Sequence, residues 1–457
     1  MYKMASTSRE LSLEEIDDIL FGPDSEFGSD IDDPTPNDDD DDDNTTDEDD
    51  MDEDVPATCS STSNSLYWNK IDNSNNPIQL GNVFDYTASH KVIDFENLNP
   101  YECFTRFFPE KIYEHVAKET NKYFKSMIAT KHPLPRRSRY HQWSDVTSDD
   151  IKAVVAIEIA MGILHKPTIE SYFSESSFLF DTPGFREVFS RDKYQLIRSA
   201  IHFSDNDKKD GNDRLSKIRP ILDMVKDLYG KYYVSNKEIS IDENMIKFKG
   251  RLFFKQYLPS EASTEWGIKV WSMTDAHTGY LLKFNVYRPT GKDSAHQPSE
   301  GLGTHVVLSL LEGYENKGHT IYMDSFYNSV DLYDKLLEKK TLACGTVRIN
   351  RKGLPSEMKQ ITVKKGALPV TWVRSDGKML ACSWQDTTRF NLLSSFGTVG
   401  TYKVKIHSKE GDREIDKPCV HVEYNKYMEE LISLINFVQH TILKKRARNG
   451  TNPSGTL

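Results

Sequence analysis

The sequence predicts a protein of the α/β class, in which an all-helical region precedes a sheet-forming core. Apolar residues recur at helical spacing from about Pro100 to Val234, and the pattern changes to alternating strands at Glu238. From there, three strand candidates are followed by a helix, a buried strand, a second helix and another strand. This order is the one expected of a ribonuclease-H-like domain, which we place at residues 237–348.

The first 90 residues form an acidic segment that we expect to be disordered. Residues 1–60 carry 23 Asp and Glu side chains against only Lys3 and Arg9. Such a segment buries too little apolar surface to offset the entropy of ordering it. The rest of the chain holds 56 basic and 47 acidic residues, a net charge of +9. An acidic arm on a basic body is typical of a polyanion-binding protein, but it is equally consistent with an arm that aids solubility.

Cysteine usage and hydropathy narrow the compartment. The five cysteines are scattered and form no C-x-x-C pair, which favours a reducing compartment and predicts neither disulfides nor zinc. The most apolar helix candidate, Ile151–Leu164, is too short to span a bilayer and contains Glu158. We therefore expect a soluble intracellular protein without a signal peptide or membrane contact.

The helical region, residues 91–236, has recognisable helix boundaries. Pro100 begins one helix, Thr147–Asp150 has the composition of a capped helix start, and Pro183 and Pro220 separate further helices. A basic loop at 131–139 interrupts this region. On its charge alone, that loop is as consistent with an ordinary exposed loop as with a surface for DNA phosphates.

The sheet-forming region is predicted element by element. The strands are Ile239–Phe248, Trp266–Met273, Tyr280–Val286, Thr320–Met323 and Leu342–Val347, and the helices are Thr304–Glu315 and Ser329–Lys339. Short strands and Gly turns predict a β-rich insertion at 349–418. The last segment, 419–457, is predicted as a strand or lead-in at Val420–Tyr424, a helix at Leu431–Lys445 and a basic tail.

Two aspartates stand where chemistry would be expected. Asp242 lies where the first strand should emerge, and Asp324 directly follows a buried apolar strand. In the predicted order these strands are neighbours, so the two carboxylates should meet and hold Mg²⁺, as phosphodiester chemistry requires. Strand-terminal Asp also commonly caps a turn or pairs with Lys, and this structural interpretation remains open on the pattern alone.

Several ordered blocks resemble the piggyBac family of DDE transposases. Ile241–Arg251 resembles its first-Asp motif, and Met323–Ser329 resembles its second. Tyr257–Pro259 with Gly267–Trp271, and Gly345–Pro355, are similar to the intervening and following blocks. The resemblance covers roughly residues 95–428 and implies a helical dimerisation and DNA-binding domain at 91–236. It further implies a ribonuclease-H-like catalytic core and Mg²⁺-dependent cutting and joining of DNA at TTAA targets.

The resemblance assigns Asp242 and Asp324 as catalytic, metal-binding carboxylates, and the chain departs from the family at the third. The family's third block ends in Asp, where this chain has Ile432 after Tyr424–Met428. The family's C-terminal cysteine-rich zinc module is also missing, so no zinc is expected. The region 419–457 therefore looks truncated relative to the family. Glu429 or Glu430 would replace the third ligand only if the helix were shifted by one turn.

We therefore predict a piggyBac-derived nuclear protein that binds DNA, with a DDE-type fold and an incomplete catalytic triad. The alternative is an active Mg²⁺-dependent transposase that uses Glu429 or Glu430, and a product of a degenerate element is a third interpretation. Whether the chain is an enzyme thus stays open. The expected partners are DNA and a second copy of the chain, with no small-molecule substrate. We expect DNA contacts from Lys131, Arg136, Arg137, Arg139, Arg251, Lys269, Arg348, Arg351 and Lys352.

Overall fold

The computed structural model describes residues 66–71, 78–131, 133–175, 180–208, 213, 215–248, 252, 255–257, 266–287, 301–408 and 411–428. These residues fall into two compact units. We call the first, Val116–Glu158 with Lys166–His202, the helical unit, and we call the remainder the sheet unit. None of the helices within the described ranges is long and apolar enough to cross a membrane.

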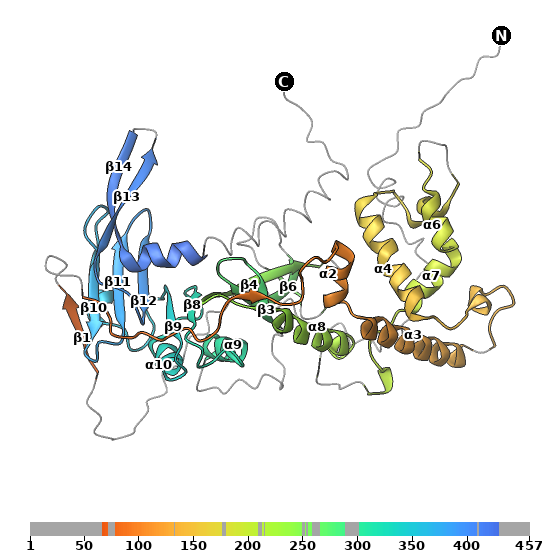
Figure 1. Cartoon of the computed structure of the whole chain (residues 1–457), viewed down its shortest axis with the longest axis horizontal. Coiled ribbons are helices and arrows are strands. Elements are labelled where there is room, and N and C mark those ends of the chain that lie inside the picture. The colour runs from red at the N-terminus through yellow and green to blue at the C-terminus, as the bar shows by residue number, and fades with distance from the viewer. Residues whose placement is uncertain are drawn as a thin grey trace, which may run out of the picture. The chain divides into compact units, whose positions relative to one another are not determined.

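The helices begin and end largely where the sequence predicts (Figure 1). They are α2 Pro100–Phe107, α3 Glu110–Thr130, η1 Arg139–Gln142, α4 Ser148–Ile163, α5 Ile169–Phe173, α6 Pro183–Val188, α7 Arg191–Ala200, η2 Asn206–Lys208, α8 Arg219–Tyr232, α9 Leu302–Leu311, α10 Val330–Glu338 and η3 Ser356–Lys359. The predicted cap before α4 is present, because the Asp150 amide donates to Thr147 Oγ1 at 3.2 Å.

The helical unit packs around a small aromatic core. Phe124 of α3 is buried with Leu196 and Ala200 of α7. The indole of Trp143 stacks on the ring of Phe124, with the ring centroids 3.7 Å apart. Helices α3 and α7 are thereby held together by apolar contacts on one face of each, as their periodicity predicts.

The described strands of the sheet unit build one ten-stranded mixed sheet and two small pairs. They are β1 Trp68–Ile71, β2 Lys91–Val92, β3 Tyr233–Val234, β4 Glu238–Lys247, β5 Gln256–Tyr257, β6 Trp266–Asp275, β7 Leu281–Val286, β8 Thr320–Met323, β9 Leu342–Thr346, β10 Val370–Arg374, β11 Leu380–Gln385, β12 Arg389–Ser394, β13 Thr401–Ser408 and β14 Gly411–Pro418. In the large sheet the order is β1-β10-β11-β12-β9-β8-β4-β6-β5, with β7 also paired to β6.

The centre of this sheet has the predicted order. β4, β6 and β7 form the antiparallel meander, and β8 and β9 follow in parallel beside β4. β12 pairs antiparallel with β9, so β10, β11 and β12 of the region predicted as an insertion extend the same sheet. β13 and β14 form a separate hairpin.

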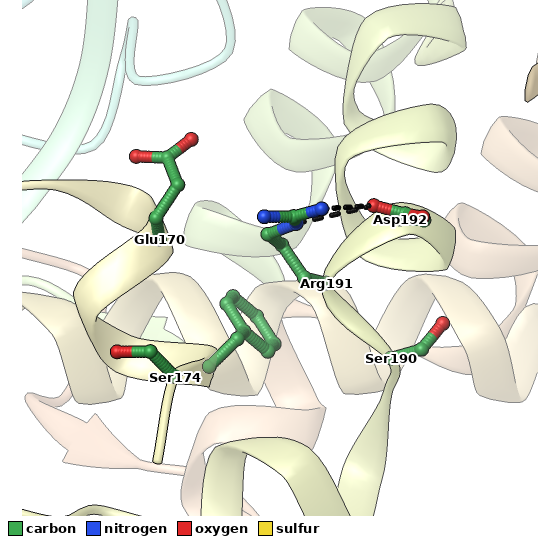
Figure 2. Close-up of a pocket in the computed structure, with 6 residues that line it drawn as sticks. Glu170, Ser174, Ser190, Arg191 and Asp192 are labelled. Atoms are coloured by element: carbon green, nitrogen blue, oxygen red, sulfur yellow. Dashed lines mark hydrogen bonds and ion pairs between the residues drawn. The ribbon is translucent and has the colours of Figure 1, made fainter. Parts of the chain in front are cut away.

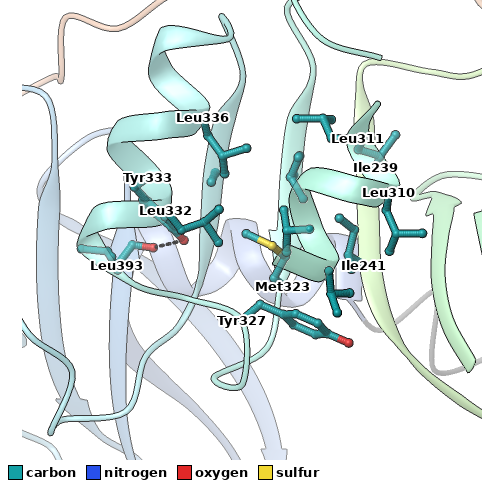
Figure 3. Packing of buried hydrophobic residues seen from close by; sticks show 14 of the residues in the cluster. Ile239, Ile241, Leu310, Leu311, Met323, Tyr327, Leu332, Tyr333, Leu336 and Leu393 are labelled. Carbon is teal, nitrogen blue, oxygen red and sulfur yellow. Dashed lines mark hydrogen bonds between the residues drawn. The ribbon is translucent and has the colours of Figure 1, made fainter. Parts of the chain in front are cut away.

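Helices cover both faces of the central strands. α9 and α10 bury their apolar residues against one face, together with Ile239, Ile241 and Met323 (Figure 3). A helix at 419–428 lies against the other face, where Tyr427 packs on Tyr322 with ring centroids 4.6 Å apart. The two strands that carry the predicted aspartates therefore lie in the middle layer of a three-layer arrangement.

The prediction of disorder through residue 90 is wrong for residues 66–71 and 78–90. β1 pairs with β10, and Leu80 is buried. The indole of Trp68 donates to the carbonyl of Gly353 at 2.7 Å and packs on the main core. The acidic residues that dominate the average composition all precede this short apolar stretch, which concealed its contribution. Residues 1–65 lie outside the described ranges.

The expected strand at Val420–Tyr424 is helical instead. Four apolar residues, Val420, Tyr424, Tyr427 and Met428, recur at positions i, i+4, i+7 and i+8 and all pack on one cluster. This spacing is helical. The β-branched residues at the start of the segment favoured a strand, and tertiary packing outweighs that local preference. The expected helix Leu431–Lys445 lies outside the described residues.

Candidate active site

The two predicted carboxylates emerge at the same level of adjacent strands. The parallel pairing of β4 with β8 ends at Ile241 opposite Met323, so Asp242 and Asp324 are the next residues on each strand. Neighbouring strands lie about 4.8 Å apart, which brings the two backbones together here. Asp242 does not end its strand, however, because β4 continues and pairs Asp242 with Ser272 of β6.

Strand alternation puts both carboxylates on one face of the sheet. Ile241 and Met323 are fully buried against α9 and α10 on the first face. The residues that follow them must therefore point to the opposite face, which Ser240 shares. Ser240 Oγ donates to the carbonyl of Tyr427 at 2.9 Å. Asp242 and Asp324 thus share the face that carries helix 419–428.

A hydrogen-bond network holds the turn after β8. Asp324 Oδ1 accepts from the Phe326 amide at 3.0 Å. Asn328 Nδ2 lies 3.0, 2.8 and 2.7 Å from the carbonyl oxygens of Met323, Asp324 and Thr346, so it ties this turn to β9. Gly345 permits that approach, because a Cβ there would clash with the carbonyl of Met323 and with Asn328 Nδ2. The backbone of Asp324 is consequently fixed from two sides.

Asp324 lies in an unfavourable place for a negative charge. Burial raises its pKa, and the carboxylate of Glu243 raises it further. The hydrogen bond from the Phe326 amide and the positive charges of Arg348 and Lys269 lower the pKa, but their combined effect is smaller. Lys269 Nζ lies 2.6 Å from Glu243 Oε2, and its side chain is only 15% exposed. Lys269 and Arg348 therefore oppose the rise in the pKa of Asp324 that burial and Glu243 cause, but they do not cancel it.

Two tyrosines border the carboxylates. Tyr327 is 1% exposed, and its hydroxyl has no hydrogen-bond partner among the described residues. Burial raises its pKa, and the charges of Glu243, Asp242 and Asp324 add to the effect, which places the hydroxyl near all three. Burial likewise raises the pKa of Tyr424 on helix 419–428, again with contributions from both aspartates. A buried hydroxyl without a partner beside carboxylates is where a cation or an ordered water would bind.

The pair fits a hard cation in ligand type. Carboxylate oxygens are the preferred ligands of Mg²⁺, and a cation would relieve the burial that disfavours charged Asp324. In the part of the chain that the structure describes, no three His, Cys, Asp or Glu side chains are grouped to hold a metal ion. Glu429, Glu430 and Ile432 lie outside the described residues. The observed donors are therefore two carboxylates.

The basic residues predicted to contact DNA occupy different environments. Lys131, Arg136 and Arg137 are exposed in the loop of the helical unit, as are Arg348 and Lys352 in the sheet unit. Of the other four, three make hydrogen bonds or ion pairs within the chain and one lies outside the described residues. Arg139 Nη1 donates to Gln195 Oε1 at 3.0 Å, and Arg351 Nη2 donates to the Phe326 carbonyl at 2.6 Å. Arg251 lies outside the described residues, and Lys269 is the partly buried ion-pair partner of Glu243.

A small pocket lies within the helical unit, between α5 and the start of α7 (Figure 2). It encloses about 240 Å³ and is lined by Glu170, Phe173, Ser174, Ser190, Arg191 and Asp192. The guanidinium of Arg191 is paired with Asp192, with Nη2 3.0 Å from Oδ1. This local pairing uses the cation that would attract an anionic ligand, and the predicted aspartates take no part in the pocket.

The comparison with known proteins identifies the family. The model of the family described as transposase IS4 matches residues 99–441. This chain is a piggyBac-derived member of that family. It is 26% identical to the human PiggyBac transposable element-derived protein 2 over 352 residues, or 74% of this chain and 55% of that protein. The human PiggyBac transposable element-derived protein 3 is 26% identical over 297 residues, 62% of this chain and 48% of that protein.

The fold of this piggyBac-derived chain matches a solved relative. Its TM-score is 0.60, at 22% identity, to a chain of the cryo-EM structure of a piggyBac transposase synaptic complex with hairpin DNA. The match covers 77% of this chain and 70% of that one, and it confirms the predicted mixed α/β, transposase-like core. This chain spans about half the length of the curated relatives that it matches.

The two aspartates were predicted from the sequence, but the roles of the residues around them were not. Glu243 follows Asp242 directly, and Asn328 and Tyr327 lie within the second predicted block, so all were visible as residues. Their roles depend on which strand lies beside which. Only the register of β8 against β9 shows that Asn328 bridges two strand ends.

Proposed function

We propose that this piggyBac-derived chain is a DNA-binding protein that retains two carboxylates of a transposase site and lacks complete cleavage and strand-transfer activity. The observation that carries the proposal is that Asp242 and Asp324 directly follow the last paired residues of β4 and β8, Ile241 and Met323, while the sequence has Ile432 at the third position. The net charge of +9 beyond the first 60 residues supports binding to a polyanion. The likeness to a transposase whose structure was solved with hairpin DNA supports DNA as that polyanion.

At this site, Asp242 and Asp324 would hold a divalent cation, for which Mg²⁺ is the natural choice. When bound, that ion would polarise a phosphoryl oxygen or activate an attacking oxygen. The chain itself contributes orientation: Asn328 fixes the turn that carries Asp324, and the Phe326 amide positions its carboxylate. Lys269 and Arg348 lower the pKa of Asp324 and so favour the charged form that binds a cation.

The nuclease assay tests the proposal. We expect little or no nicking of transposon-end or TTAA-containing duplex DNA with Mg²⁺ or Mn²⁺, although the same DNA binds. Asp242→Ala serves as the site variant, and Asp331→Ala, on the exposed face of α10, serves as the matched control. Robust cleavage by the wild-type chain and by Asp331→Ala that Asp242→Ala abolishes would overturn the inactive-site proposal.

Phosphate contacts are assigned to the exposed loop of the helical unit. Lys131, Arg136 and Arg137 are exposed there and carry three positive charges within seven residues. Replacing Arg136 and Arg137 together by Gln should weaken binding to all DNA sequences alike. It should also lower the slope of log K against log salt by about 2, since each phosphate contact contributes about 0.9. An unchanged slope would exclude this loop from the DNA interface.

The alternative is an active transposase that cuts and joins DNA at TTAA with Glu429 or Glu430 as third ligand. The observation in its favour is that helix 419–428, which directly precedes these residues, lies on the face shared by the two aspartates. Under this alternative, wild type cleaves and the double change Glu429→Gln with Glu430→Gln abolishes cleavage. Unchanged cleavage by the double variant would exclude both glutamates as ligands.

Assembly and location follow from the same proposal. Association into a homodimer should appear as twice the chain mass in light scattering. Nuclear location should depend on the basic cluster Lys444–Arg448, which has the composition of an import signal. Replacing its lysines and arginines by Gln should leave a fluorescent fusion in the cytoplasm. Nuclear accumulation of that variant would remove the cluster from the proposal.

A further inference from the structure

An exposed aromatic patch lies on β5 and β6, and β6 is the antiparallel neighbour of β4, which carries Asp242. Trp266 begins β6 and Tyr257 ends β5, and the two residues are paired partners. Their ring centroids are 5.1 Å apart, and the side chains are 47% and 48% exposed. Lys255 Nζ lies 4.9 Å from the centroid of the Trp266 ring. We call Tyr257, Trp266, Lys255 and the adjacent Ile246 the aromatic patch.

The aromatic patch shares a sheet face with the carboxylates. In antiparallel strands, paired residues point to the same face, and alternate residues along a strand return to it. Asp242 is paired with Ser272, Ile246 with Ile268, and Tyr257 with Trp266, and all lie an even number of residues apart on their strands. The burial pattern agrees, because Met245, on the other face, is 7% exposed, whereas Ile246 is 56% exposed.

The distance between the aromatic patch and the two carboxylates can be compared with the spacing of nucleotides in a DNA strand. Trp266 lies six residues along β6 from Ser272, which corresponds to about 20 Å at roughly 3.4 Å per residue. The same length covers about six base steps of a DNA strand. Asn244 lies on this face between them, in partly exposed surroundings. A strand of DNA held at the carboxylates would therefore reach the aromatic patch after about six nucleotides.

The chemistry of the patch selects its occupant. Two exposed aromatic rings beside a lysine ammonium are the combination that proteins use to bind unpaired nucleobases, with stacking on the rings and the cation near the phosphates. Aromatic residues are common in protein–protein interfaces as well, but lysine is depleted there, so Lys255 beside Trp266 favours a nucleic acid over a protein partner. The positive charge of residues 61–457 also favours a polyanion.

We propose that the aromatic patch stacks unpaired bases of DNA whose duplex part is bound elsewhere on this chain. The proposal rests on the DNA-binding function proposed above and deepens it, since it makes DNA with a single-stranded segment the preferred ligand. It assigns Trp266 and Tyr257 as base-stacking residues and Lys255 as a phosphate contact. Duplex DNA without unpaired bases gains nothing from the patch.

The test compares two labelled probes on the full chain by fluorescence anisotropy. One is a blunt duplex, and the other is the same duplex with an unpaired oligothymidine tail. Wild type should bind the tailed probe more tightly. Trp266→Ala should lose about 5- to 150-fold in affinity for the tailed probe, the loss expected for one stacked base, and should bind the blunt duplex as wild type does. Tyr257→Ala should act in the same direction.

Conservative and distant variants separate stacking from folding. Trp266→Phe retains a stacking ring, so it should keep most of the preference for the tail while losing the quenching of indole emission on binding. Tyr402→Ala removes an aromatic side chain of similar exposure, 54%, from the β13 hairpin and should change nothing. Equal thermal midpoints for all variants establish that the sheet remains folded.

The outcomes distinguish this proposal from the proposed function. If the blunt duplex binds and the tail adds no affinity, or Trp266→Ala weakens both probes equally, base stacking at the patch is wrong while DNA binding stands. A loss of oligomer mass in Trp266→Ala with an unchanged tail preference would make the patch a protein contact and overturn the proposal. If neither probe binds, the DNA-binding function fails and this inference fails with it.

Discussion

The sheet unit contains two clusters of charged side chains, one around Arg374 and one around Asp324. The pKa of a carboxyl group is lowered in the first cluster and raised in the second. Arg374 is 3% exposed, and its guanidinium lies 2.7 Å from Asp334 and 2.8 Å from Asp376. Although burial alone would raise the pKa of Asp376, hydrogen bonds from Arg374 and Lys378 lower it. At Asp324, burial prevails and the pKa is raised.

The difference separates a cluster whose charges are paired with one another from a cluster in which burial disfavours the charge of Asp324. The Arg374 cluster joins α10 to the turn after β10, and its polar atoms satisfy one another. The Asp324 cluster leaves the buried Tyr327 hydroxyl without a partner among the described residues. Substitutions in the Arg374 cluster should therefore destabilise the fold. Removing the charge of Asp324 should instead stabilise it.

The largest effect is expected at Arg374. Arg374→Met should lower the free energy of unfolding by about 3 kcal/mol, because two carboxylates lose a buried bidentate partner, a loss moderated by the exposure of Asp334. Urea denaturation measures it. Asp331→Asn, which removes the exposed pair with Lys335 on the same helix, should change stability by under about 0.5 kcal/mol. Equal effects would remove the distinction between a buried cluster and a surface pair.

A substitution at Gly345 tests how rigidly the end of β8, next to Asp324, is held. Gly345→Ala should cost about 1–3 kcal/mol, because the added methyl group meets the backbone carbonyl of Met323 and Asn328, neither of which moves freely. Unfolding by guanidinium, monitored by circular dichroism, measures the loss. Gly377→Ala is an instructive partner, since nothing lies near its Cβ and its cost comes only from a positive φ of 70°. A neutral Gly345→Ala would mean that the end of β8 is loosely held.

Asp324→Asn should stabilise the protein at neutral pH by about 0.5–2 kcal/mol, since it removes a charge that the folded state disfavours. The direction of the pKa shift determines the pH range over which stability changes. A carboxyl whose folded pKa is raised costs stability as pH rises from the unfolded value of 3.8 through the folded value. The difference in thermal midpoint between variant and wild type should therefore vanish at acid pH and grow toward neutral pH. A destabilised variant at pH 7 would place Asp324 among the structural charges.

The smallest effect is expected at Lys269. Its charge lowers the pKa of Asp324, so Lys269→Met should raise that pKa further. Any stabilisation of the chain by Mn²⁺ should then require a higher pH, because protons compete with the cation. Lys269→Arg, which keeps the charge, should leave the pH midpoint nearer to that of wild type. Identical midpoints for both variants would exclude Lys269 as a contributor to the site.

The order of the central strands and the positions of the two aspartates could be predicted from the sequence, because both depend on local patterns. Ile239 and Ile241 alternate into the core, Thr320–Met323 is a continuous apolar strand, and an Asp follows each segment. Those patterns depend on neighbours along the chain. The adjacency of Asp242 and Asp324 followed from the predicted strand order, because the two segments that precede them, β4 and β8, are neighbours in the sheet.

What the sequence concealed depends on distant residues. Trp68 appears as a lone aromatic after an acidic arm, and its partner strand lies some 300 residues later. Val420 favours a strand by its own preference, and its helix is stabilised by the sheet face on which it packs. Lys269 was expected to contact DNA because of its charge, and it is instead the partly buried ion-pair partner of Glu243. Charge pairing across a sheet is not visible in any local window.

The pairing of β1 with β10 has a consequence for synthesis of the chain. The amide of Tyr67 donates to Ser375 Oγ across 308 residues of sequence. At about 5–20 residues per second, roughly 15–60 s pass on the ribosome between the appearance of the two strands. During that time β1 has no partner, and the core that buries Trp68 does not exist. The pairing of β1 at the sheet edge is thus a late step in the folding of each new chain. Until β10 has been synthesised, β1 and Trp68 remain exposed to chaperones and to aggregation.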